Sequence, residues 1–148
     1  MNKEFVPYPE AVAMKELGFD EECMGCFMID FHKHLCHVLN FNNADDYIKT
    51  SNSGRKPRSY IKAPLWQQAF DWFEKKYNLE GLVSKHFQHS QKISEVEEFF
   101  YIWNISDFNK RRQMGEIGNQ CIKSGSELKH EEAKLTCLKK LIEIVKDK

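Results

Sequence analysis

The residues best suited to bind a ligand form a basic segment in the first half of the chain. Between Tyr47 and Phe70 the sequence has no acidic residue, yet it contains five lysines and arginines. Such a cluster creates a positive local field, and a guanidinium group can hold a phosphate through two hydrogen bonds. Aromatic rings beside the cations can stack on a base. We therefore predict an anion site, suited to a nucleotide, with these residues: Arg55, Lys56, Arg58, Tyr60, Lys62 and Trp66. The alternative interpretation is a solvated loop.

A second group of reactive side chains combines cysteines with histidines: Cys23, Cys26, His32, His34, Cys36 and His37. Cysteine and histidine are the usual ligands of zinc. However, the single C-x-x-C pair is not repeated, which differs from the spacing of a zinc finger. Neighbouring residues of a strand also point to opposite faces, so a strand through 36–37 would separate two of the candidate ligands. We predict buried cysteines and half-exposed histidines, with no metal and no cofactor.

Two further histidines, His86 and His89, have the spacing of an acid–base pair. Small phosphoesterases with such pairs carry two copies of His-x-Ser or His-x-Thr, and neither histidine here begins that pattern. The sequence also lacks the G-x-S-x-G, H-E-x-x-H, Walker and G-x-G-x-x-G motifs. We therefore assign no catalytic residue, and a small hydrolase ranks third among the functional hypotheses.

The elements that position these side chains belong to a chain of 148 residues with 22 basic and 22 acidic residues. That length suits a single domain over 1–148 that folds without a metal. Five cysteines, an odd number, argue against a disulfide framework. No stretch has the character of a signal peptide or a transmembrane helix, so we expect a cytoplasmic protein without a membrane partner. A net charge of zero disfavours binding to duplex nucleic acid.

Three segments have the apolar spacing of helices. Residues 9–17 predict a short helix that Gly18 ends, and residues 129–146 predict the last helix of the chain. The helix over 64–77 has the clearest stripe, with i, i+3, i+4, i+7 and i+11 spacing: Trp66, Ala69, Phe70, Phe73 and Tyr77. Trp72 lies outside this stripe, which predicts an exposed ring and favours a homodimer.

Four segments have the character of strands. Alternating residues predict strands over 27–31 and 35–39, joined by a turn at 32–34. Apolar residues on both faces of 98–105 predict a central strand. Residues 81–87 predict a weaker strand, and 88–95 predict the hairpin loop between the two. Long irregular segments are expected at about 40–62 and 106–127. The order α-β-β-α-β-β-α predicts an α+β fold: a small antiparallel sheet of about four strands with three helices.

Three stretches of the sequence carry a resemblance to known proteins. They are EFVPY (4–8) with KELGFD (15–20), APLWQQAFDWF (63–73), and EEA (131–133) with CLKKLI (137–142). Together they resemble a group of small uncharacterised proteins encoded in Bacteroidetes genomes and their phages. The stretches contain no catalytic motif and do not include the cysteine–histidine group. The resemblance therefore implies a context, that of a mobile-element accessory protein, rather than an activity.

Accessory proteins of phages often act by binding, and some sequester the nucleotide signals of bacterial immunity. By this analogy the first hypothesis is a non-catalytic, anti-defence protein that binds a small anionic ligand, such as an immune-signalling nucleotide. The alternative is a protein–protein adaptor or inhibitor of a host factor, with no small ligand. A homodimer would place two basic segments around one shared ligand.

Overall fold

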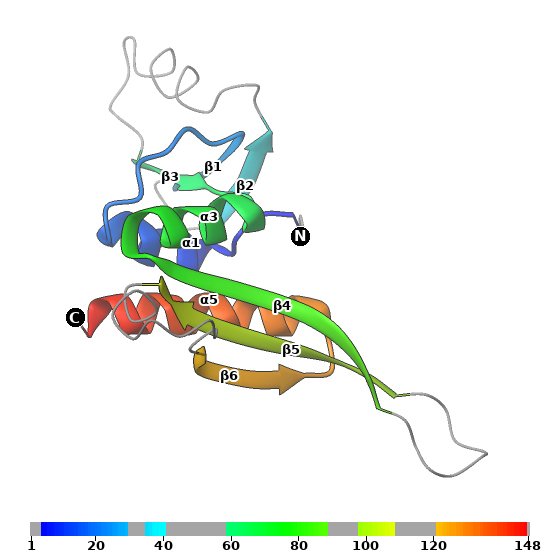
Figure 1. The fold of residues 1–148 in the computed structure, drawn as a ribbon. Helices are drawn as coiled ribbons and strands as arrows, with labels where there is room; N and C mark the ends of the chain where they lie inside the picture. The colour runs from blue at the N-terminus through cyan, green and yellow to red at the C-terminus, as the bar shows by residue number, and fades with distance from the viewer. Residues whose placement is uncertain (1–3, 30–34, 41–58, 89–97, 109–120, 148) are drawn as a thin grey trace, which may run out of the picture. The chain divides into compact units, whose positions relative to one another are not determined.

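The computed structural model describes residues 4–29, 35–40, 59–88, 98–108 and 121–147. The chain divides into two compact units, Met1–Ala69 and Phe70–Lys148. The single domain expected over 1–148 stays a prediction. Figure 1 gives the order of the helices and strands along the chain.

Among its described residues, the first unit contains one helix and a three-stranded antiparallel sheet. Its elements are α1 (Tyr8–Glu16), β1 (Gly25–Ile29), β2 (Leu35–Asn40) and β3 (Ser59–Ala63). The strand order is β2-β1-β3, so β1 is central. The hairpin that the sequence predicted is confirmed, with Phe27 opposite Val38, whereas its turn at 32–34 lies outside the described residues.

Helix α1 ends in the way the sequence predicts. Leu17 is the C-cap residue, and Gly18 follows with φ of 86°. The amide of Gly18 donates to the carbonyl of Lys15, and the amide of Phe19 donates to the carbonyl of Met14. This pair of bonds is the Schellman arrangement, in which a left-handed residue is needed and glycine adopts it without steric cost.

The core of the first unit lies between α1 and the sheet. Helix α1 packs on β3, and the ring of Tyr8 meets the ring of Phe27 edge to face with centroids 5.5 Å apart. Phe27 and Ile61 are opposite each other in the β1–β3 register and both are buried. The extended segment before α1 also pairs with the end of β3, because the amide of Val6 donates to the carbonyl of Pro64 at 2.9 Å.

The second unit contains a longer antiparallel sheet and the C-terminal helix. Its strands are β4 (Leu79–Gln88), β5 (Glu98–Asp107) and β6 (Cys121–Glu127), in the order β4-β5-β6, and its helix is α5 (His130–Lys146). Helix α3 (Trp66–Tyr77) begins before the boundary between the units and leads into β4. Asn78 makes that turn with φ of 55°, a conformation that asparagine tolerates better than most residues.

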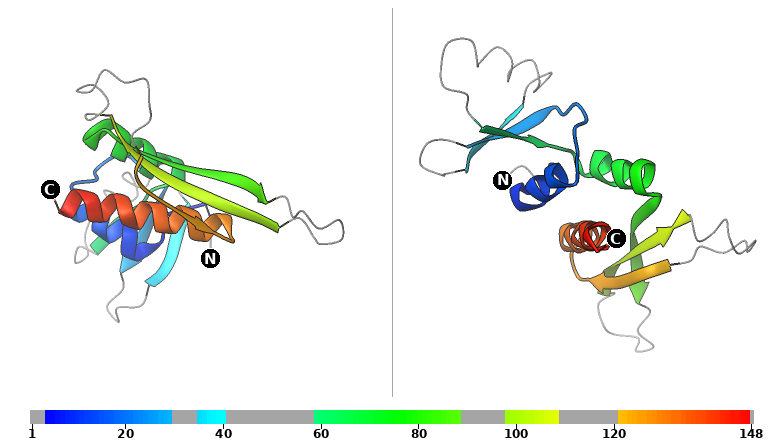
Figure 2. Two further views of the ribbon diagram at one scale, coloured as in Figure 1. Left: turned by 60° about the horizontal axis from the view of Figure 1, so that its bottom comes forward. Right: turned by 90° about the vertical axis from the view of Figure 1, so that its left-hand side faces the viewer.

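Helix α5 covers one face of this sheet (Figure 2). The side chains that point toward it alternate with those on the other face, as the pleat requires. Leu79, Ile105 and Trp103 on the strands, and Leu138 and Leu141 on the helix, are buried. At the rim, Lys123 of β6 bonds Glu143 of α5 at 3.0 Å, and Thr136 donates to Glu127.

The α+β class, the antiparallel pairing and the helices predicted over 9–17, 64–77 and 129–146 are confirmed in the described residues. The single sheet of about four strands is corrected, because the strands of the described residues form two sheets of three strands each. The two strands that the sequence did not reveal are β3, at the end of the segment predicted to be irregular over about 40–62, and β6, at the end of the one over about 106–127. Of those segments, 41–58 and 109–120 lie outside the described residues.

The stripe of the central helix is also corrected in detail. Phe73 is fully buried, as predicted, but Trp66 and Phe70 are only half-buried. Trp72, predicted to be exposed, is 5% exposed and meets the rings of Phe73 and Tyr77 edge to face. Its ring therefore offers no surface for a homodimer. None of the described helices has the length and uninterrupted apolar character needed to cross a bilayer.

Candidate functional site

Large apolar side chains are exposed where β4 ends and β5 begins. Phe87 is 58% exposed and Phe99 is 40% exposed. Their rings meet edge to face with centroids 4.8 Å apart. The ammonium group of Lys85 lies 4.0 Å from the ring centroid of Phe99 and 5.7 Å from that of Phe87. We call Lys85, Phe87 and Phe99 the ribbon end.

The register of the two strands creates this cluster. Phe87 is directly opposite Phe99, and Lys85 is directly opposite Tyr101, so all four side chains are on one face. Further along the same face, α5 covers the sheet, and its first residue, His130, lies against Tyr101 with centroids 5.2 Å apart. The ribbon end therefore lies on the face that α5 packs on, past the start of that helix.

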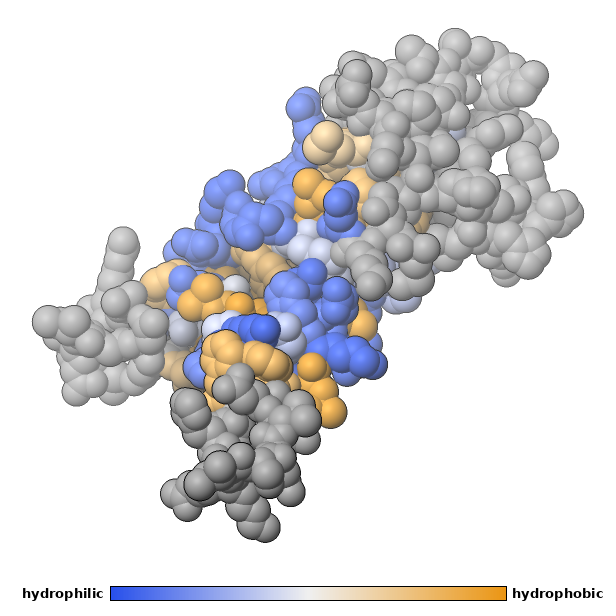
Figure 3. Space-filling view, turned by 90° about the vertical axis from the view of Figure 1, so that its right-hand side faces the viewer, coloured by the Kyte–Doolittle hydropathy of each residue, from blue (hydrophilic) through white to orange (hydrophobic). Residues whose placement is uncertain are grey.

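Figure 3 looks toward this end of the hairpin and shows hydrophobic residues at the molecular surface beside hydrophilic ones. Leu128, which joins β6 to α5, is 76% exposed. It directly follows Glu127, whose partner in the β5–β6 register is Tyr101. Exposed aromatic side chains of this kind are enriched at protein–protein contact sites.

The opposite face of the same strands carries a polar pair. Ser84 Oγ lies 2.9 Å from His86 Nε2, and the imidazole stacks on Phe100 with centroids 5.9 Å apart. Both side chains are exposed. A serine beside a histidine resembles a nucleophile and its base, but catalysis also requires a third group that orients the base and a shielded site. His89, the second predicted histidine, lies outside the described residues.

The predicted anion site is described only in part. Arg55, Lys56 and Arg58 lie outside the described residues. Tyr60 and Lys62 are on one face of β3, where Tyr60 is 9% exposed, and Trp66 is half-buried at the first residue of α3. Strand β3 begins at Ser59, so residue 58 directly precedes this strand in the sequence.

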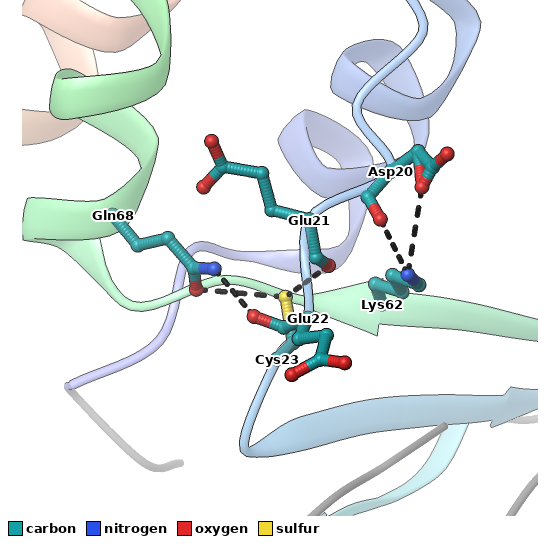
Figure 4. A network of polar contacts seen from close by, with 6 residues as sticks. All are labelled: Asp20, Glu21, Glu22, Cys23, Lys62 and Gln68. Atoms are coloured by element: carbon teal, nitrogen blue, oxygen red, sulfur yellow. Dashed lines mark hydrogen bonds and ion pairs between the residues drawn. The ribbon is translucent and has the colours of Figure 1, made fainter. Parts of the chain in front are cut away.

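Lys62, the described cation of this set, already contacts the loop after α1 (Figure 4). Its Nζ donates to the carbonyl of Asp20 at 2.7 Å and lies 3.7 Å from the Asp20 carboxylate. Because this carboxylate is 92% exposed, the ion pair contributes little energy. Lys62 therefore has an anionic neighbour that the sequence, free of acids over 47–70, did not reveal.

Gln68 anchors the next part of that loop from α3. Its amide nitrogen donates to the carbonyl of Glu22 at 2.6 Å, and its amide oxygen accepts from the thiol of Cys23 at 3.5 Å (Figure 4). Cys23 also lies 3.5 Å from the carbonyl of Glu21. These bonds satisfy the buried thiol of Cys23 and hold the loop to α3, which is a structural role rather than a reactive one.

The cysteine–histidine group does not come together among the described residues. Cys23 precedes β1 and Cys26 lies in it, both buried. Cys36 and His37 are residues of strand β2, whereas His32 and His34 lie outside the described residues. Within the described ranges, no three His, Cys, Asp or Glu side chains are grouped as metal ligands.

Groups on helix α5 and at its N-cap have shifted pKa values. Burial raises the pKa of the Cys137 thiol to about 12, so this thiol stays protonated and unreactive. Hydrogen bonds from Lys140 and Lys123 lower the pKa of Glu143. A hydrogen bond to Glu132 raises the pKa of Lys129. These shifts belong to the packing and rim of the helix, so they indicate no acid–base centre.

Comparisons with known proteins give no match: no family model, no curated protein and no solved structure is similar to this chain. The candidate site therefore rests on the side chains alone. The pattern over 98–105 predicted a central strand, which the order β4-β5-β6 confirms, but it did not reveal that Phe99 is exposed. The available signal was that Phe87 and Phe99 flank the same hairpin loop, which makes them neighbours if the strands pair.

Proposed function

We propose that this protein is a cytoplasmic, non-catalytic adaptor or inhibitor that binds another protein through the ribbon end. The observation that supports the proposal is the exposed Phe87–Phe99 pair with Lys85 above it. Large aromatic side chains are costly to leave in water, and a partner that covers them recovers that free energy. Lys85 orients the contact toward an electron-rich or acidic group of the partner.

The experiment compares capture of a partner by wild-type protein and by a Phe87→Ser/Phe99→Ser variant. Tagged proteins are incubated with an extract of the cells that encode the chain, and bound proteins are quantified by mass spectrometry. We expect one partner to be retained by the wild type and reduced about tenfold or more by the variant.

The matched control is Met24→Ser, because Met24 is as exposed as Phe87, at 58%. This variant should capture the partner as the wild type does. Equal capture by the ribbon-end variant and the wild type would remove the ribbon end from the proposal. Circular dichroism of each variant establishes that the fold is retained.

A second candidate function is the binding and sequestering of a small anionic ligand, such as an immune-signalling nucleotide, by a phage-type accessory protein. The run of five cations without an acid supports it, together with the position of Trp66 where α3 begins after this segment. Its test is calorimetric titration with mono-, di- and cyclic nucleotides. Arg55→Ala/Arg58→Ala should weaken binding at least tenfold, because each lost charge-assisted contact costs roughly 1.5–3 kcal/mol.

The two candidates differ in what purifies with the protein. Excess absorbance near 260 nm that heating releases favours the nucleotide. A clean spectrum with a bound host protein favours the adaptor.

A further inference from the structure

The edge of the second sheet at β4 has the properties of a strand-pairing surface. In the described part of the chain, β4 has a strand neighbour on one side, β5. It is ten residues long and keeps an unbroken register with β5 from Leu79 to Gln88. From Leu82 to Phe87 its side chains are exposed, apart from the half-buried Val83. A long, regular, exposed edge is a template for another strand.

The other edge of the same sheet, β6, is built differently. It has seven residues, of which Ser124, Gly125 and Ser126 follow one another, and its register with β5 shifts between Ile105 and Ser106. Short length and a bulge are two of the devices by which proteins protect an edge from pairing. β4 contains neither a proline nor a register shift. The contrast indicates that β4 is the edge adapted for pairing.

Charge favours a second copy of this chain as the occupant. The chain has a net charge of zero, so two copies do not repel each other. The ribbon end also contains both halves of a cation–π contact, Lys85 and the phenylalanine rings. A surface that carries both halves can pair with itself across a two-fold axis.

We propose that β4 pairs antiparallel with β4 of a second copy, about a two-fold axis at His86. In this register Lys85 lies opposite Phe87 of the second copy, and Phe87 lies opposite Lys85 of the second copy. An axis at Lys85 would instead place two ammonium groups opposite each other, which is unfavourable. The axis at His86 also uses the outer residues of β4 and leaves its first residues, which directly follow α3, outside the contact.

The pairing joins two three-stranded sheets into one sheet of six strands. It uses the edge of β4, whereas the proposed partner contact also requires Phe99 on the central strand β5. The homodimer and the partner contact can therefore be tested separately. This β4 interface takes the place of the homodimer that the sequence predicted through an exposed Trp72.

The decisive test is an engineered disulfide. Directly opposite residues of antiparallel strands have Cα atoms about 4.5–5.5 Å apart, within the range of a disulfide. His86→Cys, made together with Cys121→Ser to remove the thiol that is exposed among the described cysteines, should form a covalent dimer on mild oxidation. Ser84→Cys in the same background is the matched control, because four residues of strand separate it from its equivalent, about 13 Å.

Light scattering supplies the second measurement. Wild type should show about 35 kDa at micromolar concentration, twice the 17.5 kDa of one chain. Lys85→Glu should raise the dissociation constant about tenfold, whereas Phe99→Ser should change it less. A mass of 17.5 kDa at all concentrations, or cross-linking of Ser84→Cys as strong as that of His86→Cys, would overturn the proposal. Loss of partner capture by Phe99→Ser in a monomeric protein would leave the adaptor function in place.

Discussion

The two ends of the β4–β5 ribbon share one backbone register but have different surroundings. At the inner end, Leu79 and Ile105 are fully buried, and Trp103 is 6% exposed beneath α5. At the outer end, Phe87 and Phe99 are 58% and 40% exposed. The same pairing thus supports a core at one end and a contact surface at the other. The cover that α5 provides, rather than strand pairing, decides which aromatic residues become core.

Truncation at the inner end should have the largest effect. Ile105→Ala removes a fully buried side chain and leaves a cavity beneath α5. We expect the free energy of unfolding to fall by about 2–5 kcal/mol, measured by urea denaturation. A loss below about 1 kcal/mol would show that this part of the sheet is not a packed core.

Adding a methyl group at Gly125 should have the next largest effect. A Cβ at this position would lie 2.6–2.8 Å from atoms of the Trp103 indole, which is held directly opposite in the register. Gly125→Ala should therefore destabilise the protein by about 1–3 kcal/mol and change the tryptophan fluorescence. Ser126→Ala on the exposed face of β6 is the control and should leave both unchanged.

A substitution at the outer end should affect stability least among the apolar changes. Phe87→Ser removes a ring that is mostly in water and one aromatic pair. The expected loss is about 0.5–1 kcal/mol, again by urea denaturation. A loss of unfolding free energy as large as that of Ile105→Ala would mean that the ribbon end belongs to the core. That result would contradict its interpretation as a contact surface.

The smallest effect is expected from the ion pairs at the rim of α5. Glu143 accepts from Lys140 at 2.6 Å and from Lys123 at 3.0 Å, which lowers its pKa below the ordinary value of 4.5. A carboxyl with a lowered folded-state pKa stabilises the fold above pH 4.5, and this contribution disappears as the pH falls through the folded-state pKa.

Glu143→Gln should therefore lower the Tm slightly at pH 7 and by less at pH 3, as measured by calorimetry at both pH values. High salt should reduce the difference at pH 7, because the carboxylate is 43% exposed. An equal change at both pH values would show that the charge of Glu143 is not responsible.

Local patterns predicted the elements whose signals are contained in their own residues. Gly18 predicted the end of α1 because a left-handed residue must follow the helix there. The helices α3 and α5 and the hairpins β1–β2 and β4–β5 follow from periodicity alone. β3 and β6 did not. β3 has only five residues, and β6 contains the run Ser124, Gly125, Ser126, so each gives a weak local signal and forms when a neighbouring strand offers its backbone.

The candidate site was harder to predict from the sequence than the helices and strands, because it depends on contacts between residues that are far apart in the chain. Lys62 was predicted to bind an anion because no acidic residue is near it in the sequence. In the structure, however, the carboxylate of Asp20 lies beside its ammonium group. Trp72 was predicted to be exposed because it lies outside the helical stripe. In the structure its ring is buried and contacts the rings of Phe73 and Tyr77. A stripe records one face of a helix and does not reveal how many faces the rest of the fold covers.

The sequence by itself determined the α+β class, the three helices and the presence of a basic segment, because each depends on residues close together in the chain. Only the tertiary structure decided which aromatic residues are exposed, which lysine has an acidic neighbour and which strand forms an edge. Burial and pairing depend on what covers a residue from elsewhere in the chain, and α5, which covers Trp103 but not Phe99, comes after both in the sequence.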